Sequence, residues 1–232
     1  MDTCDSRGSV ALLRDDSVLQ VVVHESAEDY SSWLLPAVGR ALEASGVEMR
    51  SVDGYAVAAG PGSFTGVRVG LTTVKAWGEV YGKRIAAVSR LEAIAAQGAL
   101  GRSHVAAFVD AQRGQVFGAL FRRKGEGLER LGEERVIPPG KFIDTAAELA
   151  KGESISWVSI DAAVLAWEGN WKAREARGDQ VESISSVLAP AIGRIGMREL
   201  TAGRFTDALS LDANYVRRSD AEIFWKGAAH GG

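Results

Sequence analysis

Short apolar runs alternate with longer stretches of helical periodicity along the first part of the chain. Residues 9–14 and 18–23 are rich in Val and Leu, and the Asp-Asp-Ser step between them has turn chemistry, so this pattern predicts a β-hairpin. Apolar positions within 30–45 recur at helical spacing, which predicts a helix. The wholly apolar run 54–59 is typical of a buried strand.

The segment 65–81 carries small and apolar residues on one helical face. We predict a helix there, then a strand at 84–88 and another helix that begins at Leu91. Glycines on such a face favour the close approach of another backbone. The stripe therefore suits either packing inside the protein or contact with a partner, and the sequence leaves both roles open. Its members are Val67, Gly70, Leu71, Val74, Trp77, Gly78 and Tyr81.

The second half of the chain starts a similar series of elements. We predict two strands, a helix, a strand and a helix, at 105–109, 115–121, 140–150, 155–160 and 186–201. Two halves with the same order of elements indicate a duplicated α/β unit.

This duplication predicts two lobes. We assign residues 1–100 to an N-terminal lobe and residues 101–204 to a C-terminal lobe. The tail, residues 205–232, is expected to pack back on the first lobe. The polar, aperiodic segment 167–178 is expected to be a loop.

Composition narrows the functional classes. The 232 residues are 46% hydrophobic and 25% charged, as in an ordinary globular protein. A formal net charge of −3 argues against a generally basic nucleic-acid binder. Because Cys4 is the single cysteine, an internal disulfide and a cysteine-clustered zinc site are excluded. The chain shows neither a membrane-length apolar run nor a signal-peptide pattern, so we expect a cytoplasmic protein without a membrane partner.

The most informative motif is the segment 60–70, GPGSFTGVRVG. A glycine-rich turn between a buried strand and a helix N-terminus presents main-chain N–H groups, and such a place either binds an anion or packs closely on another backbone. Val67-Arg68 stands where a Walker A loop has Lys-Ser/Thr, so this is not such a loop. The residues that would form a phosphate or anion loop are Gly60, Gly62, Ser63, Thr65 and Gly66.

Three stretches together carry a resemblance to a known family. Segment 60–70, segment 88–95 (VSRLEAIA) and segment 110–117 (DAQRGQVF) follow in an order and spacing that resemble the bacterial TsaB (YeaZ) family. The resemblance implies a two-lobed actin-like ATPase (ASKHA, RNase H-like) fold with a duplicated βββαβα unit. Members of that family have a short strand ahead of an Asp-Thr-Ser step, whereas this chain begins at Met1-Asp2, so we expect the first strand to be truncated.

The resemblance also implies a role. Family members serve as a non-catalytic scaffold that binds the catalytic paralogue TsaD, with the small ATPase TsaE, for threonylcarbamoylation of the adenosine next to the anticodon in tRNAs that read codons starting with A. The tRNA is then contacted indirectly, a homodimer is a further expected partner, and no cofactor is required, with weak nucleotide binding left open. The implied partner-interface residues are Leu34, Leu35, Val38, Val67, Gly70, Leu71, Val74, Trp77 and Gly78.

One comparison within that resemblance bears on catalysis. Members of the TsaD family carry a His-x-x-x-His metal pair just after the strand that corresponds to 85–88. Alignment of the Leu-Glu step puts Arg90 and Ile94 at those two positions, and neither side chain is a metal ligand. We therefore expect no metal site and no catalytic residue. The alternative is an ATP-dependent enzyme of the same fold, either a threonylcarbamoyltransferase or a sugar kinase.

Overall fold

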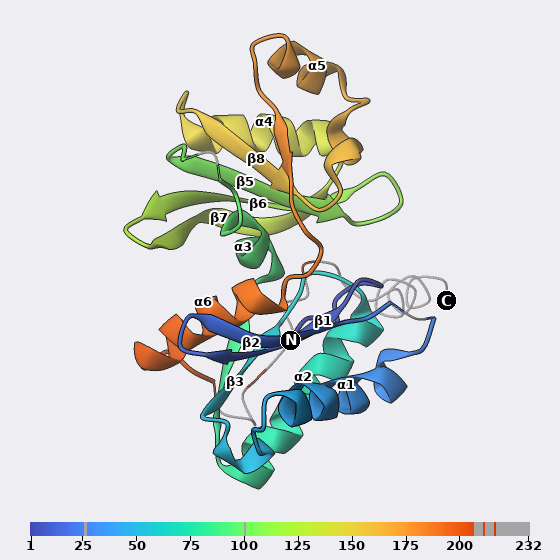
Figure 1. Cartoon of the computed structure of the whole chain (residues 1–232). Helices are drawn as coiled ribbons and strands as arrows, with labels where there is room; N and C mark the ends of the chain where they lie inside the picture. The colour runs from blue at the N-terminus through green and yellow to red at the C-terminus, as the bar shows by residue number, and fades with distance from the viewer. Residues whose placement is uncertain (26, 100, 207–210, 212–215, 217–232) are drawn as a thin grey trace, which may run out of the picture.

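The computed structural model describes residues 1–25, 27–99, 101–206, 211 and 216. These residues form two lobes, one above the other, with the short helix α3 (Arg90–Ala95) between them (Figure 1). The expected two-lobed α/β architecture is confirmed. Among the described residues, no helix is both long and apolar enough to cross a membrane.

The strands of the first lobe form two separate pairs. β1 (Ser9–Arg14) and β2 (Ser17–Val23) make the predicted antiparallel hairpin. β3 (Gly54–Ala58) and β4 (Arg84–Val88) pair in parallel, as strands do when a helix, here α2 (Phe64–Tyr81), connects them. The glycine-rich loop consequently lies at the carboxyl end of β3.

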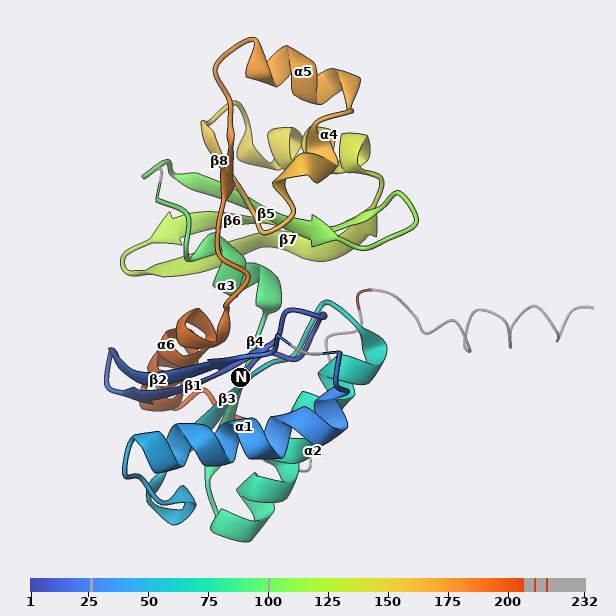
Figure 2. The same ribbon diagram turned by 45° about the vertical axis from the view of Figure 1, so that its right-hand side comes forward.

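Met1 and Asp2 lie between the two strand pairs and connect them (Figure 2). Asp2 and Ser9 exchange two main-chain hydrogen bonds, of 2.8 and 2.9 Å. On the other side, the Met1 amine donates to Ala56 O at 2.8 Å, and the Ala58 N–H donates to Met1 O at 2.9 Å. These two residues therefore have β1 as an antiparallel neighbour and β3 as a parallel one.

The second lobe contains a five-stranded sheet in the order β7-β6-β5-β8-β9. Its central strand, β5 (His104–Asp110), pairs antiparallel with β6 (Val116–Lys124) and parallel with β8 (Ile155–Ser159). The outer strands are β7 (Gly127–Ile137) and β9 (Val181–Ser183). β5 thus has the same two kinds of neighbour as Met1–Asp2, which reflects the duplicated unit.

Helices cover both faces of the first lobe (Figure 2). α1 (Tyr30–Ala44) and α2 pack on one face, and a short 3-10 turn, η1 (Met49–Ser51), leads from α1 to β3. The other face packs against α6 (Ala189–Thr201), which falls within the sequence range that we assigned to the second lobe. Gly196 permits this approach, because a Cβ at that position would overlap the Ala56 side chain.

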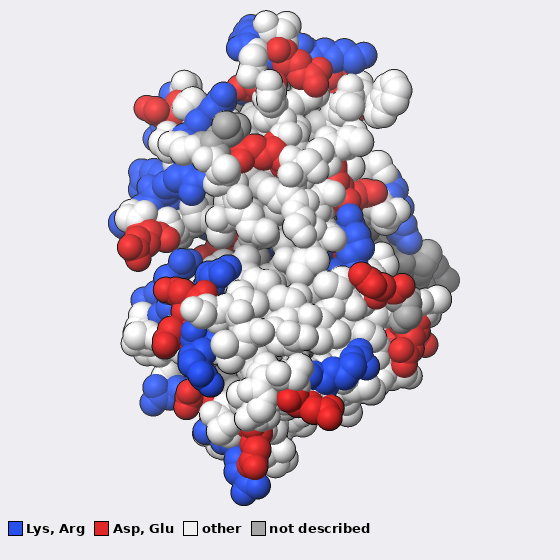
Figure 3. All heavy atoms as spheres, viewed as in Figure 1, with Lys and Arg blue, Asp and Glu red and all other residues white. Residues whose placement is uncertain are grey.

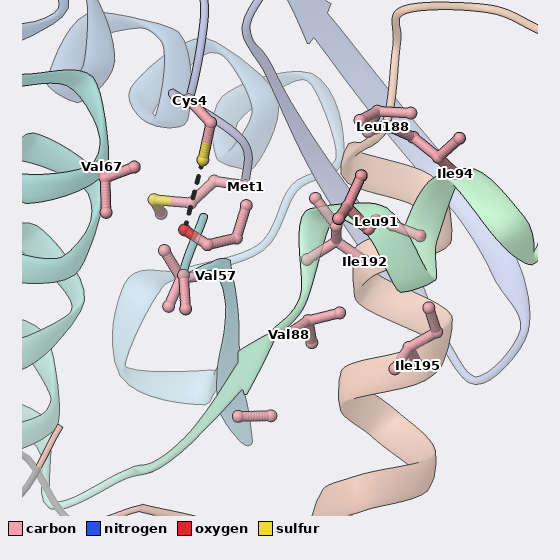
Figure 4. Packing of buried hydrophobic residues seen from close by; sticks show 14 of the residues in the cluster. Met1, Cys4, Val57, Val67, Val88, Leu91, Ile94, Leu188, Ile192 and Ile195 are labelled. Carbon is pink, nitrogen blue, oxygen red and sulfur yellow. Dashed lines mark hydrogen bonds between the residues drawn. The ribbon is translucent and has the colours of Figure 1, made fainter. Parts of the chain in front are cut away.

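One hydrophobic core joins the two lobes. Leu91 of α3 lies beside Ile192 of α6, and Ile94 lies near Leu188 at the start of α6 (Figure 4). The same core continues to the inner face of the second sheet. A separate core lies on the outer face of that sheet. It is covered by α4 (Pro139–Ala150), η2 (Ala162–Leu165) and α5 (Gly169–Glu175).

The prediction of a loop at 167–178 is wrong. Residues 169–175 form α5, and its Trp171, only 2% exposed, packs edge-on against Trp157 with ring centroids 5.4 Å apart. One buried Trp in an otherwise polar helix produces no apolar periodicity, so the pattern gave no signal. β7 was not predicted either, because its charged residues stand in adjacent groups, 129–130 and 133–135, which hide the period-2 alternation typical of a strand.

The start of the C-terminal tail returns to the first lobe. The Thr206 N–H donates to Ile85 O of β4 at 2.9 Å, and Leu211 and Val216 belong to or pack on the main core. The rest of the predicted tail, beyond these positions, lies outside the described residues. The division of the chain at residue 100 stays a prediction.

Replacement of Trp171 by Ala should destabilise the second lobe. The loss of a buried aromatic side chain costs about 3–5 kcal/mol of unfolding free energy, measured here by denaturant titration. The matched control is Trp167→Ala, since Trp167 is 86% exposed and its loss should change the free energy by about 0.5 kcal/mol or less. Equal effects of the two substitutions would contradict the placement of α5 in the core.

Candidate functional site

The glycine-rich loop packs against the main chain at the start of the protein. The Ser63 N–H donates to Cys4 O at 2.6 Å, and the Arg90 N–H donates to Gly60 O at 2.7 Å. A Cβ on Gly62 would overlap the Cys4 carbonyl, and one on Gly66 would overlap the Thr3 carbonyl. These two glycines are therefore required by backbone contact inside the protein, whatever else the loop does.

The loop also ends in a helix cap. The Ser63 Oγ accepts from the Gly66 N–H at 3.3 Å, and Ser63 O accepts from the Val67 N–H at 2.9 Å. The N–H groups of Ser63 and Gly66 thus have acceptors within the chain, while Thr65 lies exposed at the start of α2. Such internal bonding favours the structural interpretation of the loop over the anion-binding one.

The helical stripe on α2 faces the interior of the first lobe. Val67, Leu71 and Val74 are buried, and Val74 is fully so. Gly70 faces Thr3 and Val57, and Gly78 faces Ile85; Trp77, half-buried, packs on the Tyr55 ring with centroids 5.5 Å apart. Of the two roles open from the sequence, the structure shows core packing for the buried members of the stripe, and an interface role for the predicted set stays a prediction.

The α1 residues expected at an interface have mixed environments. Leu34 is buried at 1% exposure, Val38 is half-buried against the main core, and Leu35 projects into solvent with 57% exposed. Leu35 is thus the member of the predicted set that a partner would meet first.

An open groove of about 490 Å³ runs between α1 and α2. Phe64, 38% exposed, stands in this groove with the Arg68 guanidinium 3.7 Å from its ring centroid, a cation–π contact. Sequence reasoning did not select Phe64 or Tyr30 for an interface, although an aromatic residue within a glycine-rich motif was a usable signal. The groove is lined by Tyr30, Leu34 and Leu35 from α1 and by Phe64, Arg68 and Thr72 from α2.

The face of the molecule seen in Figure 1 carries few charged side chains across its middle. Figure 3 shows that uncharged side chains extend across the middle of the face seen in Figure 1, while Lys, Arg, Asp and Glu gather along its sides. This face therefore lacks the continuous basic patch that direct binding of a nucleic-acid backbone requires.

Arg90 and Ile94 stand at the two positions where the resemblance places the metal-binding histidine pair of the TsaD family, and both are buried. Arg90 is 2% exposed, its Nε lies 3.3 Å from Asp2 Oδ2, and its Nη2 contacts the Asp5 carboxylate. Burial alone would lower the pKa of Arg90, but the charges of Asp2 and Asp5 outweigh burial and raise it. Ile94 is fully buried in the main core. A guanidinium with two carboxylates thus fills this position.

Asp5 is the carboxylate that continues this network toward the surface. Burial tends to raise its pKa, but the Arg90 charge and the hydrogen bond from the Arg7 N–H outweigh burial and hold the pKa below the ordinary value of 3.8. Asp5 is therefore ionised at neutral pH, and it is held by cations rather than poised for proton transfer.

Cys4 is not a candidate nucleophile. Its Sγ lies 3.6 Å from Ala58 O, and burial raises the pKa of the thiol well above its ordinary value. Among the described residues, no group of three or more His, Cys, Asp and Glu side chains is placed to hold a metal ion.

Comparisons with known proteins agree with the expected resemblance. The family model described as TsaD, tRNA N6-adenosine threonylcarbamoyltransferase, matches residues 20–170. The tRNA threonylcarbamoyladenosine biosynthesis protein TsaB of Bacillus subtilis (strain 168) is 34% identical over 148 residues, 64% of this chain and 65% of that protein. The protein of the same name from Escherichia coli (strain K12) is 29% identical over 170 residues, 72% of this chain and 71% of that protein.

These matches cover only part of the relatives. The chain spans about two thirds of the length of the Bacillus protein.

The structure titled YeaZ from Pseudomonas aeruginosa matches 92% of this chain and 96% of its own, with a TM-score of 0.73 and 24% sequence identity. This likeness shows a shared two-lobed α/β fold.

Substitution of Gly70 by Ala should destabilise the first lobe. A Cβ there would lie 2.6 Å from Thr3 Oγ1 and 3.3 Å from Val57 Cγ2, so we expect a loss of about 1–3 kcal/mol in unfolding free energy. Gly39→Ala on α1 is the matched control, because its Cβ would meet nothing within 4 Å. That change should stabilise the protein by up to about 1 kcal/mol. Stabilisation by Gly70→Ala would show that the stripe is not tightly packed.

Acid should remove the stabilisation that Asp5 provides. Because its folded pKa lies below its ordinary value, the contribution is complete at neutral pH and is lost as the pH falls through the folded pKa. We expect the unfolding free energy of the wild type to fall from about pH 5 downward more steeply than that of Asp5→Asn. Glu48→Gln, which removes an exposed ion pair with Arg50, should keep the wild-type slope. Parallel slopes for wild type and Asp5→Asn would refute the role of Asp5.

Proposed function

Because the chain belongs to the TsaB (YeaZ) family, we propose that it is a non-catalytic subunit in the biosynthesis of threonylcarbamoyladenosine in tRNA. In this role it binds a TsaD-type transferase, together with a TsaE-type ATPase, and contacts tRNA only through that complex. The modified base is the adenosine next to the anticodon in tRNAs that read codons starting with A.

The observation that carries the non-catalytic role is the buried Arg90. Its guanidinium, held by Asp2 and Asp5, stands at the position where the resemblance expects a metal ligand, and Ile94 stands at the second. Removal of one partner from such a buried set leaves an uncompensated charge, so the arrangement opposes any rearrangement into a metal site. A guanidinium is also always protonated and cannot act as a general base.

The groove between α1 and α2 supports the binding role. It is of ligand-site size, and it brings exposed apolar side chains, Leu35 and Phe64, next to the cation of Arg68. Apolar and aromatic anchors beside an arginine are typical of protein interfaces. We propose that a helical surface of the transferase occupies this groove, and that a second copy of the chain competes for it in the homodimer.

The internal bonding of the 60–66 loop supports a structural rather than a nucleotide-binding role. The loop amides of Ser63 and Gly66 bond to the chain itself, and Asp5 brings negative charge to the neighbouring turn. We propose that nucleotide is not required by this subunit and that the ATPase supplies the nucleotide-dependent step.

Reconstitution tests this function. Threonylcarbamoyl transfer to tRNA is measured with a cognate TsaD-type transferase and TsaE-type ATPase, with and without this chain. We expect transfer to depend on the chain and the chain without transferase to give none. Equal transfer in its absence would overturn the scaffold role. Transfer by the chain without the transferase, from the same threonylcarbamoyl donor, would establish the enzymatic alternative instead.

Leu35→Glu should weaken binding of the transferase without unfolding the protein. Leu35 is exposed at the groove, so the charge leaves unfolding free energy within about 0.5 kcal/mol of wild type but should raise the dissociation constant about ten-fold or more. Val80→Glu is the matched control, since Val80 is 74% exposed on α2 and does not line the groove. The dissociation constants of both variants are measured by calorimetric titration with the transferase. Equal affinities of the two variants would place the interface elsewhere.

A further inference from the structure

Five side chains of alternating charge run from the centre of the first lobe to the second lobe. Arg90 joins Asp2 and Asp5 in the interior. Arg7 then bridges outward, with its Nη2 3.1 Å from Asp5 Oδ2 and its Nη1 3.1 Å from Asp161 Oδ1. Asp161 follows β8, so the last ion pair crosses from one lobe to the other.

The second lobe holds the Asp161 carboxylate in a fixed position. Its Oδ2 accepts from the Asp110 N–H at 3.0 Å, and the Asp161 N–H donates to Ser159 Oγ at 2.8 Å. The Ser159 hydroxyl in turn donates to Phe108 O at 2.7 Å. Asp161 is thus anchored to the carboxyl ends of β5 and β8, and its charge presents a rigid acceptor to Arg7.

The four residues 5–8, here called the latch loop, also bond to the wall of the groove. The Gly8 N–H donates to Tyr30 Oη at 2.7 Å, and the Tyr30 hydroxyl donates to Asp5 O. His24 adds a second link, because its Nδ1 contacts Ser6 O at 3.1 Å and its ring lies 4.6 Å from that of Tyr30. Tyr30 begins α1 and lines the groove.

We propose that the latch loop couples the Arg7–Asp161 ion pair between the two lobes to the shape of the groove. With the Arg7–Asp161 pair made, the loop is held and Tyr30 is fixed as one end of the groove. When the pair breaks, the loop loses its anchor in the second lobe and releases Tyr30. By linkage, an occupant that contacts Tyr30 stabilises the Arg7–Asp161 pair to the same extent that the pair strengthens its binding.

The ion pair is suited to such a switch. Arg7 is 40% exposed and Asp161 19%, so their pair is solvated and gives way at a smaller cost than the buried pair of Arg90. The interior part of the network therefore keeps the loop attached to the first lobe, while the outer pair opens and closes. The identity of the occupant rests on the function proposed above, but the coupling is a property of the chain alone.

Amide hydrogen exchange on the isolated chain tests the coupling. Arg7→Gln and Asp161→Asn each break the pair from a different lobe. In both, we expect the amides of residues 5–8 and of the first turn of α1 to exchange about five-fold faster. Arg122→Gln, which removes an exposed ion pair within the second lobe, should leave them unchanged. Unchanged exchange of β5 and β8 confirms that the second lobe stays folded.

Two results would overturn the proposal. Wild-type exchange of residues 5–8 in Arg7→Gln would show that the pair does not hold the loop. In both variants, faster exchange of residues 5–8 without faster exchange in the first turn of α1 would show that Tyr30 does not transmit the release of the loop to α1. Titration with the transferase separates the coupling from the proposed function. About five-fold weaker binding of the transferase to Arg7→Gln than to wild type supports both. If the transferase does not bind wild type while the loop and α1 still exchange together, only the proposed partner is wrong.

Discussion

The contact between the main chain of Thr3 and Cys4 and the glycine-rich loop is the constraint on which the placement of α2 depends. Gly62 and Gly66 bring the loop against the Cys4 and Thr3 carbonyls, and Gly70 brings α2 against the Thr3 side chain. This close approach buries the apolar face of α2 over β3 and leaves its other side beside α1. The groove is therefore a consequence of backbone packing at the opposite face of the same helix.

The second organising feature is electrostatic. A buried guanidinium costs a large desolvation free energy, and Arg90 is compatible with the core only because Asp2 and Asp5 compensate its charge. The same carboxylate of Asp5 then positions Arg7 at the boundary between lobes. A position expected to hold metal chemistry in a related enzyme thus serves here to tie the first turn, α3 and the second lobe together.

Much of the fold was predictable from local pattern, and part of the site was not. Strands such as 54–59 and the helix at 65–81 had strong apolar periodicity, and their boundaries agree with the structure to within about two residues. The α5 segment failed because one buried Trp171 carries its packing. At the site, the resemblance alone showed that Arg90 stands where a metal ligand is found in the related enzyme. Its bonds to Asp2 and Asp5, which lie far away in sequence, could not be predicted.

The sequence by itself determined the order of the main strands and helices of the first lobe, the glycine-rich turn and the absence of a histidine pair, because these depend on local periodicity and residue chemistry. Only the tertiary structure decided that Val67, Leu71 and Val74 face the core while Leu35 and Phe64 face solvent. An amphipathic helix specifies that one face is apolar, but not which neighbour covers that face. That depends on contacts between residues distant in sequence, as does the ion pair that joins the lobes.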